Sequence, residues 1–311
     1  MKENKIKIDK KAFLSLAGFI IVFVSFAILT GGRSLARTNL ITIFNQAFFI
    51  MLGGIGATFV YAHGGIDLSI GALQGLCVFV AVKCMIEFNL VVAIIAAVSL
   101  GAFSGVFLGA VSVYIRIPVF IAGLSLQYIW KGLLKVATST GMINIPSGYT
   151  WLDSWGIKVV VLLIVFAVIY YLFTYTRFGR YIKAIGGNSE VARLSGVQVN
   201  KYIVLAYVVL GVCIGIGAVL SGIRAGGVNP NSGAGLEMDV LIAIVLGGMP
   251  LSGGAGARVS CGVIGALMIV IIENGFVLLG ADPNMVGGIK GIIFIVTIFI
   301  TFARKRDQII N

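Results

Sequence analysis

Few side chains in the apolar parts of this sequence could take part in acid–base, nucleophilic or metal chemistry. The sequence has no G-x-x-x-x-G-K-[ST] phosphate loop, no H-E-x-x-H zinc motif and no nucleophile elbow. The single histidine, His63, is expected to mark the end of a helix, and the cysteines have no zinc-like spacing. We therefore expect no catalytic residue, and neither a metal nor a cofactor bound by this chain itself.

Two residues of opposite charge, Glu273 and Lys290, fall inside long apolar runs. Glu273 lies about six residues before the outer end of one run, and Lys290 about five residues after the outer start of the next. Because these positions have equal depth on consecutive helices, we predict a structural ion pair between them. The scarcity of other charges at such depth argues against a carrier driven by an ion gradient.

Asp67 follows two glycines at the start of another apolar run. A carboxylate at this position can accept hydrogen bonds from free backbone N–H groups, so helix capping is the first interpretation. The alternative is that short turns at membrane depth close a translocation path on the cytoplasmic side. The candidate residues of these turns are Asp67, Leu68, Ser69, Leu251 and Ser252.

Uncharged polar residues within the apolar runs also have two interpretations. Asn45, Gln46, Gln74 and Gln127 could offer hydrogen bonds to a polar neutral solute that passes between the helices. They could equally form hydrogen bonds to neighbouring helices. The residues alone leave both interpretations open, and Asn45 and Gln46 are kept as candidates for a translocation path.

The scaffold that positions these residues must lie in a membrane. With 59% hydrophobic residues and a mean hydropathy of +1.08 over 311 residues, the chain cannot hide its apolar surface in a water-soluble core. We expect an all-α polytopic membrane protein of about ten transmembrane helices, forming a single domain over residues 1–311. The expected runs are 12–30, 40–62, 68–86, 90–114, 117–137, 157–175, 202–223, 236–249, 259–279 and 285–303, of which 236–249 is short.

Clusters of positive charge predict the orientation. A net charge of +12 would suggest a nucleic-acid partner for a soluble protein, but the lysines and arginines here gather in three places. These are the N-terminal tail 1–11, the segment 176–201 and the C-terminal tail 304–311. The positive-inside bias places all three on the cytoplasmic side, so both termini are expected there and no nucleic acid is expected as a partner.

Glycine patterns suggest a repeat and predict helix packing. GGIDLSIGA at 64–72 and GGMPLSGGA at 247–255 agree at six of nine positions, and each follows an apolar run. In the ten-helix arrangement both phrases lie on the cytoplasmic side, so the two halves are expected to be related as parallel repeats. Four-residue spacing also places glycines on single helix faces for close packing, namely Gly101, Gly105, Gly109, Gly211, Gly215, Gly287 and Gly291.

The segment 176–201 contains the start and stop signals of a short helix. Asn188 or Ser189 can serve as the N-cap, Glu190 stands in the first turn and Gly196 follows the last. Val191 and Leu194 share one face of this two-turn helix, with Arg193 beside them. Because so short a helix is unstable alone in water, we expect it to dock on a partner. The alternative is a solvated basic loop without a partner.

Three phrases together resemble the permease subunits of bacterial ABC importers for ribose, xylose, galactose and similar monosaccharides. They are TRFGRYIKAIGGNSEVARLSGVQVNK, GGIDLSIG and AIVLGGMPLSGGAGA, in the order found in that family, which includes the branched-chain amino acid permeases. The resemblance covers the chain from about residue 40 onward. It implies a pair of permease chains in the membrane, as a homodimer or a related heterodimer. A cytoplasmic ABC ATPase that holds ATP and Mg, and an extracytoplasmic sugar-binding protein, would complete the transporter.

The resemblance also assigns roles to residues. It implies that Asn188 to Gly196 form the segment that couples to the ATPase, and that Arg177, Gly179 and Arg180 hold its approach. Glu237 and Asp239 would cap the next helix or face the binding protein. Pro250 departs from the small polar residue that is more usual in the family, so the geometry of the second glycine-rich turn is open.

The expected function is that of a membrane permease, not an enzyme, which imports a monosaccharide across the bacterial cytoplasmic membrane with ATP hydrolysed by a separate subunit. The same architecture could import an autoinducer-type sugar, a nucleoside or a branched-chain amino acid. An ion-coupled secondary carrier is the alternative of a different class.

Overall fold

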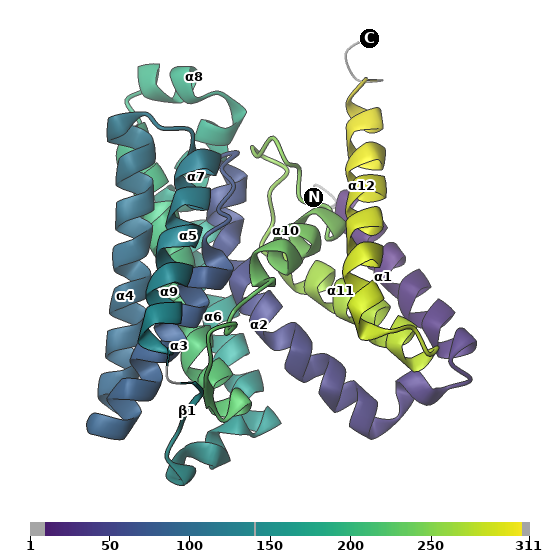
Figure 1. Cartoon of the computed structure of the whole chain (residues 1–311). Helices are drawn as coiled ribbons and strands as arrows, with labels where there is room; N and C mark the ends of the chain where they lie inside the picture. Colours follow the sequence, from purple (N-terminus) through teal and green to yellow (C-terminus); the bar gives the residue numbers. More distant parts are fainter. Residues whose placement is uncertain (1–9, 140, 307–311) are drawn as a thin grey trace, which may run out of the picture.

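The computed structural model describes residues 10–139 and 141–306, and the described chain is mostly helical. Its long helices, coloured along the sequence in Figure 1, are α1 (Lys10–Leu29), α2 (Arg37–Ala62), α3 (Ile70–Glu87), α4 (Leu90–Ala110), α5 (Val119–Ala137), α6 (Trp155–Tyr175), α9 (Val199–Ala225), α11 (Ser260–Leu278) and α12 (Pro283–Arg306). The shorter ones are α7 (Arg177–Gly187), α8 (Ser189–Leu194) and α10 (Leu236–Leu246). Single turns η1 (Arg33–Leu35), η2 (Val111–Ile115) and η3 (Ser147–Asp153) complete the helical elements.

Every apolar run expected from the sequence is helical, which confirms the all-α polytopic class. Among the described residues, seven helices are long and apolar enough to cross a membrane: α2, α3, α4 with η2, α5, α6, α9 and α11. The apolar parts of α1 and α12, Ser15–Leu29 and Met285–Phe299, are shorter, and α10 has only 11 residues. A count of ten crossings, with both termini cytoplasmic, stays a prediction.

Helix α2 runs between two groups of helices (Figure 1). On one side lie α3, α4, α5, α6 and α9, and on the other α1, α10, α11 and α12. Every residue from Ile50 to Ala62 is buried, because α9 and α11 pack against α2 from both sides. The end of α2 therefore contacts both groups.

Glycines set the closest helix contact, between α4 and α9. Gly101 lies against the backbone of Gly211, and Gly105 against the backbone of Tyr207, so a side chain at any of these glycines would collide with a neighbouring main chain. This confirms the predicted packing role of the glycines on α4 and α9. The prediction is wrong for Gly287 and Gly291 within this chain, because no described atom lies within 4 Å of a Cβ built at either one.

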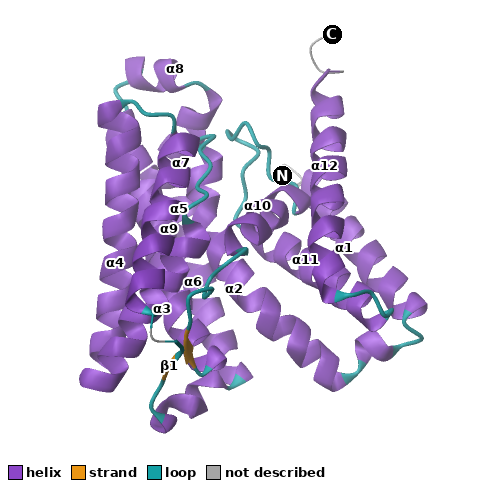
Figure 2. Ribbon diagram, in the orientation of Figure 1, coloured by secondary structure: helices purple, strands orange, loops and turns teal. Residues whose placement is uncertain are grey.

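A two-stranded antiparallel sheet joins two loops, as Figure 2 shows in orange. Strand β1 (Ile143–Asn144) follows α5, and β2 (Gly227–Val228) follows α9, with Ile143 paired to Val228. This pairing holds the segment between α9 and α10 against the segment that follows α5. Helix α8 and the C-terminal end of α12 both lie at the opposite end of the molecule (Figure 1), in keeping with the predicted common side for these basic segments.

Candidate functional site

Helix α8 begins and ends where the sequence signals predict. The Asn188 side chain accepts hydrogen bonds from the backbone N–H groups of Glu190, at 3.0 Å, and Val191, at 3.1 Å. Gly196 has a φ of 82° and donates its N–H to the Arg193 carbonyl at 3.0 Å. Both caps are encoded locally, so the predicted start, length and end of this helix are confirmed.

The apolar face of α8 is open. Leu194 is 86% exposed and Val191 57%, whereas Ala192 on the opposite side is buried against the rest of the chain. Glu190 and Arg193 form an ion pair within the helix, and both side chains are largely exposed. No described residue covers the two apolar side chains, and α8 therefore presents a small apolar surface with a charged pair beside it.

Helix α7, which leads to α8, was not expected from the sequence, where only the 188–196 helix was predicted. It buries Gly179, Ile182 and Ile185, while Arg177 and Arg180 point outward and are exposed. Gly179 lies directly against the carbonyl group of Phe173, where a side chain has no room. The spacing of Phe178, Ile182 and Ile185 was the signal for this helix, because residues three or four apart share a helix face.

Aromatic side chains fix α7 against the ends of the spanning helices. Phe178 stacks on Phe59 of α2 with ring centroids 4.4 Å apart. The ammonium of Lys183 lies 4.3 Å from the centroid of the Phe173 ring, and burial lowers the pKa of this lysine. These contacts make α7 a rigid connection between α8 and the end of α2.

The C-terminal end of α7, next to α8, meets the end of α2 and the second glycine-rich phrase. Gly186 packs against the Ala62 carbonyl and the backbone of Gly254, and the Gly254 N–H donates to the Ala62 carbonyl at 2.8 Å. Gly64 in turn faces the Ser252 carbonyl, which lies 3.6 Å from a Cβ built on that glycine. The two phrases, distant in sequence, therefore adjoin each other directly beneath the helix that carries α8.

The first phrase forms a buried turn ahead of α3. One carboxylate oxygen of Asp67 accepts hydrogen bonds from the backbone N–H and the hydroxyl of Ser69, both at 2.7 Å. Asp67, Leu68 and Ser69 are almost fully buried. Asp67 therefore closes a turn around Ser69, the N-cap of α3, and does not cap the helix as expected, because no described side chain accepts a hydrogen bond from the first turn of α3. In the second phrase, Leu251 is half-buried and Ser252 is exposed.

Buried polar atoms without partners surround this turn. Among the described residues, the hydroxyls of Tyr61 and Tyr207 and the Nε2 atom of His63 accept and donate no hydrogen bond. The His63 ring meets the Tyr207 ring edge-on, at 5.6 Å between centroids. An unpaired buried polar group costs about 1–3 kcal/mol, so these three groups leave hydrogen-bonding capacity for a solvent molecule or for a rearranged turn.

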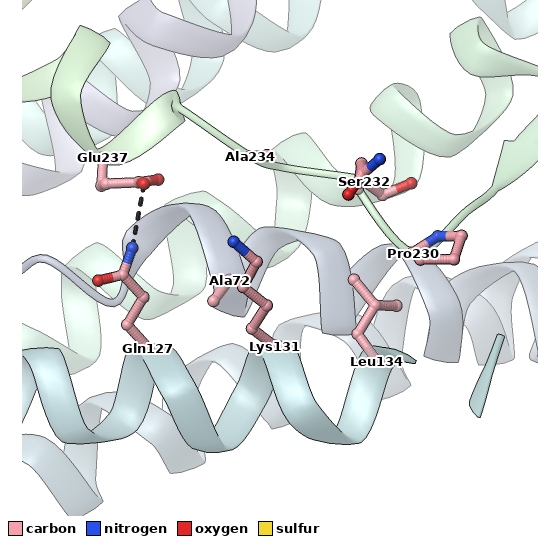
Figure 3. Close-up of a pocket in the computed structure, with 9 residues that line it drawn as sticks. Ala72, Gln127, Lys131, Leu134, Pro230, Ser232, Ala234 and Glu237 are labelled. Atoms are coloured by element: carbon pink, nitrogen blue, oxygen red, sulfur yellow. Dashed lines mark hydrogen bonds between the residues drawn. The ribbon is translucent and has the colours of Figure 1, made fainter. Parts of the chain in front are cut away.

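At the other end of the molecule, a small polar pocket lies between α5 and the start of α10 (Figure 3). The Gln127 amide donates to one carboxylate oxygen of Glu237 at 3.1 Å, shown as a dashed line, and the Lys131 side chain rises beside them. Gln127 therefore bonds a neighbouring helix, one of its two expected roles. Gly235 is the N-cap of α10 and Glu237 lies in the first turn, so Glu237 does not form the cap itself.

The predicted ion pair is present and has a third member. The ammonium of Lys290 on α12 lies 2.8 Å from a carboxylate oxygen of Glu273 on α11 and 2.6 Å from one of Asp239 on α10. This confirms the contact between Glu273 and Lys290. The sequence analysis missed Asp239 as a partner, because its position near the start of α10 suggested a cap.

Comparison with known proteins places these features in one family. The family model described as the branched-chain amino acid transport system / permease component matches residues 39–298. The chain belongs to this permease family. No solved structure gave a significant match.

Curated relatives of this permease include several importer subunits. The ribose import permease of Escherichia coli (strain K12) is 34% identical over 275 residues, covering 84% of this chain and 85% of the relative. The galactose/methyl galactoside import permease of the same strain is 28% identical and covers 96% of this chain and 99% of its own length. The autoinducer 2 import system permease of Photorhabdus luminescens is 31% identical, over 76% of this chain and 73% of the relative.

One buried charge of the permease was missed at the sequence level. Lys158 on α6 has no exposed surface, and its ammonium donates to the Asn45 side chain at 2.7 Å and pairs with Asp153 at 2.6 Å. The sequence analysis did not single it out, although it lies inside the expected run 157–175. Asn45 bonds a neighbouring helix, the second of its two expected roles, and its place in a translocation path stays a prediction. Gln46, one position along, is exposed on a different face.

Proposed function

We propose that this chain is the membrane permease of an ATP-driven importer and passes a monosaccharide across the bacterial cytoplasmic membrane. The names of the ribose and galactose relatives, matched over more than four-fifths of this chain, support the substrate class. The polytopic helical fold supports a path through the membrane rather than a surface role. Transport in this proposal involves no covalent chemistry in the permease, and ATP and Mg belong to a partner ATPase.

The coupling route is the second part of the proposal. Val191 and Leu194 dock on the cytoplasmic ATPase, with the Glu190–Arg193 pair at the rim of the contact. Asn188, Ser189 and Gly196 hold the shape of the helix, and α7 carries its displacement inward. The observation that carries this proposal is the packing of Gly186 against Ala62 and Gly254, which links the docking helix to the end of α2 and to the second glycine-rich turn.

Those turns form the proposed cytoplasmic gate. Asp67, Leu68 and Ser69 of the first turn, and Leu251 and Ser252 of the second, separate or approach when α7 moves. The unpaired hydroxyls of Tyr61 and Tyr207 support two alternative states, because a rearranged turn can pair them at a gain of about 1 kcal/mol each. Closing and opening would thus involve small local changes, driven from α8.

Two further partners complete the proposed transporter. A second permease chain, identical or related, would lie beside this one in the bilayer, and a sugar-binding protein would deliver the solute from outside. The open backbone at Gly291 on α12 supports a partner chain on that side, since no described atom lies within 4 Å of a Cβ built there.

A related substrate class has one specific observation behind it. The similarity to the autoinducer 2 permease, and the family description itself, support an autoinducer-type sugar or a branched-chain amino acid as the solute.

Reconstitution tests the proposed function. The chain is placed in vesicles with its proposed partner ATPase and sugar-binding protein, and uptake of D-ribose, D-xylose and D-galactose is measured. We expect uptake of at least one sugar that requires internal ATP. Uptake that follows a proton or sodium gradient without ATP would support a secondary carrier and contradict the proposal.

A further inference from the structure

A cavity of about 420 Å³ lies between α2, α11 and α12. Its lining residues are Gln46, Glu273, Asn274, Val277, Val286, Gly287 and Lys290. The volume falls within the range of about 300–1,000 Å³ that is usual for small-molecule sites. The cavity is distinct from the proposed cytoplasmic gate, because none of its lining residues belongs to either glycine-rich turn.

The walls of this cavity carry both hydrogen-bond donors and hydrogen-bond acceptors. Gln46 is exposed, and its amide has no partner among the described residues. Asn274 exchanges two hydrogen bonds with Asn39, both at 2.9 Å, which fixes its amide while leaving one N–H and one oxygen lone pair available. Helix packing accounts for Asn274 but not for Gln46.

The charges in the wall are held in place by one another. Lys290 is paired with Glu273 and Asp239 and keeps further N–H donor capacity, while each carboxylate keeps acceptor capacity. One cation with two carboxylates leaves a formal charge of −1, which disfavours anionic solutes such as sugar phosphates. The arrangement suits a neutral molecule with many hydroxyl groups.

Part of the α12 wall is bare backbone. Gly287 lines the cavity together with Val286 and Lys290 of the same helix, and a Cβ built at Gly287 has no described atom within 4 Å. The cavity therefore has open space at Gly287, where a ring-shaped solute can lie close to the helix.

We propose that this cavity binds the monosaccharide during its passage, with Gln46 and the Glu273–Lys290 pair as hydrogen-bonding residues and Gly287 as the face that makes room for the sugar ring. Sugar hydroxyls both donate and accept, and so match amides, a carboxylate and an ammonium together. This inference rests on the proposed function, because a monosaccharide must first be the transported solute.

Filling the cavity without changing its polar residues tests the proposal. In vesicles with the partner subunits, G287W should lower ATP-dependent uptake of the transported sugar roughly tenfold or more, since its side chain occupies the site. G288W is the matched control: the neighbouring glycine also has open space at its Cβ but does not line the cavity. Q46A should lower uptake roughly two- to tenfold, the effect of one hydrogen bond.

Thiol labelling provides a second measurement that needs no turnover. The variants G287C and G288C are labelled with a charged methanethiosulfonate reagent, with or without the transported sugar at high concentration. We expect the sugar to slow labelling of G287C and to leave G288C unchanged.

The outcomes separate the two proposals. If the wild-type transporter takes up none of D-ribose, D-xylose and D-galactose, the proposed function fails. If it takes up a sugar, but G287W and Q46A retain wild-type uptake and the sugar does not protect G287C, the cavity is not a sugar site. If G287W and G288W both block uptake, the labelling experiment decides. Slower labelling of G287C alone in the presence of the sugar supports the site, whereas labelling of G287C at the same rate with and without the sugar overturns it.

Discussion

The Gly254 N–H donates a hydrogen bond to the carbonyl of Ala62 at 2.8 Å, and this bond joins the second glycine-rich phrase to the last residue of α2, just before the first phrase. Gly186 of α7 lies against the same pair of backbone groups. Since α7 leads directly into α8, we propose that a displacement of the exposed helix acts on this contact. The predictions below test separate parts of this arrangement.

The first prediction concerns Gly186. A Cβ at this position would lie 2.6 Å from the Gly254 nitrogen and closer still to the Ala62 carbonyl oxygen, so G186A must displace α7 from the turns. Overpacking of this kind costs about 1–3 kcal/mol, and we expect ATP-dependent uptake to fall roughly tenfold. The control is G187A, because a Cβ on Gly187 meets no described atom within 4 Å. Equal uptake by the two variants would contradict the proposed route through α7.

The second prediction concerns the charged pair on α8. Glu190 and Arg193 are exposed, so their ion pair contributes only about 0.2–1 kcal/mol to stability. The double variant E190A/R193A should insert normally, hydrolyse ATP with its partner and take up little sugar. K201A removes another exposed cation of the same loop and serves as the control. Normal ATP-dependent uptake by the double variant would count against the coupling role of this pair.

The third prediction separates a structural role of Asp67 in its buried turn from a role in gating. D67N retains an oxygen that can accept the hydrogen bonds from Ser69, whereas D67A removes both of them. We expect D67A to lose about 1–3 kcal/mol of the free energy of unfolding, which appears as a lower melting temperature in detergent. D67N should melt close to the wild type. A gating role for the charge would appear instead as lost uptake in D67N despite unchanged stability.

The fourth prediction concerns the buried Lys158. K158M removes the ammonium and leaves the Asn45 amide and Asp153 without their partner, so the free energy of unfolding should fall by about 1–3 kcal/mol. The double variant N45L/K158M replaces both buried groups by apolar ones and should recover part of this loss. Uptake by the double variant near the wild-type level would confirm that Asn45 serves packing. Complete loss of uptake in a stable double variant would place Asn45 in the translocation path.

Local signals made part of this structure predictable. Each cap of α8 is set by a residue within the helix or next to it, and the Glu273–Lys290 contact followed from equal depth on consecutive helices. Helix α7 was missed because its arginines drew the interpretation toward a loop, although Ile182 and Ile185 already marked a buried face.

The remaining features depend on packing between distant segments. The bond from Lys158 to Asn45 cannot be predicted from residue spacing, since only the whole fold brings α6 next to α2. The same is true of the contact between Asp239 and Lys290, which joins α10 to α12. The same holds for Gly186, whose neighbours come from the end of α2 and from the second glycine-rich phrase. Gly287 and Gly291 illustrate the opposite case: their spacing predicts helix packing, but no described residue packs against them.

The most direct test of the central claim is ATP-dependent sugar uptake by L194D in vesicles that also contain the ATPase and the binding protein. Leu194 is 86% exposed, so the aspartate leaves the fold intact but places a charge in the proposed docking surface. Gln198, also exposed and in the same loop, provides the control Q198D with the same added charge. The account predicts that L194D lowers uptake roughly tenfold or more and weakens ATPase binding, while Q198D does neither. Wild-type uptake and ATPase binding by L194D would contradict the claim that α8 receives the motion of the ATPase.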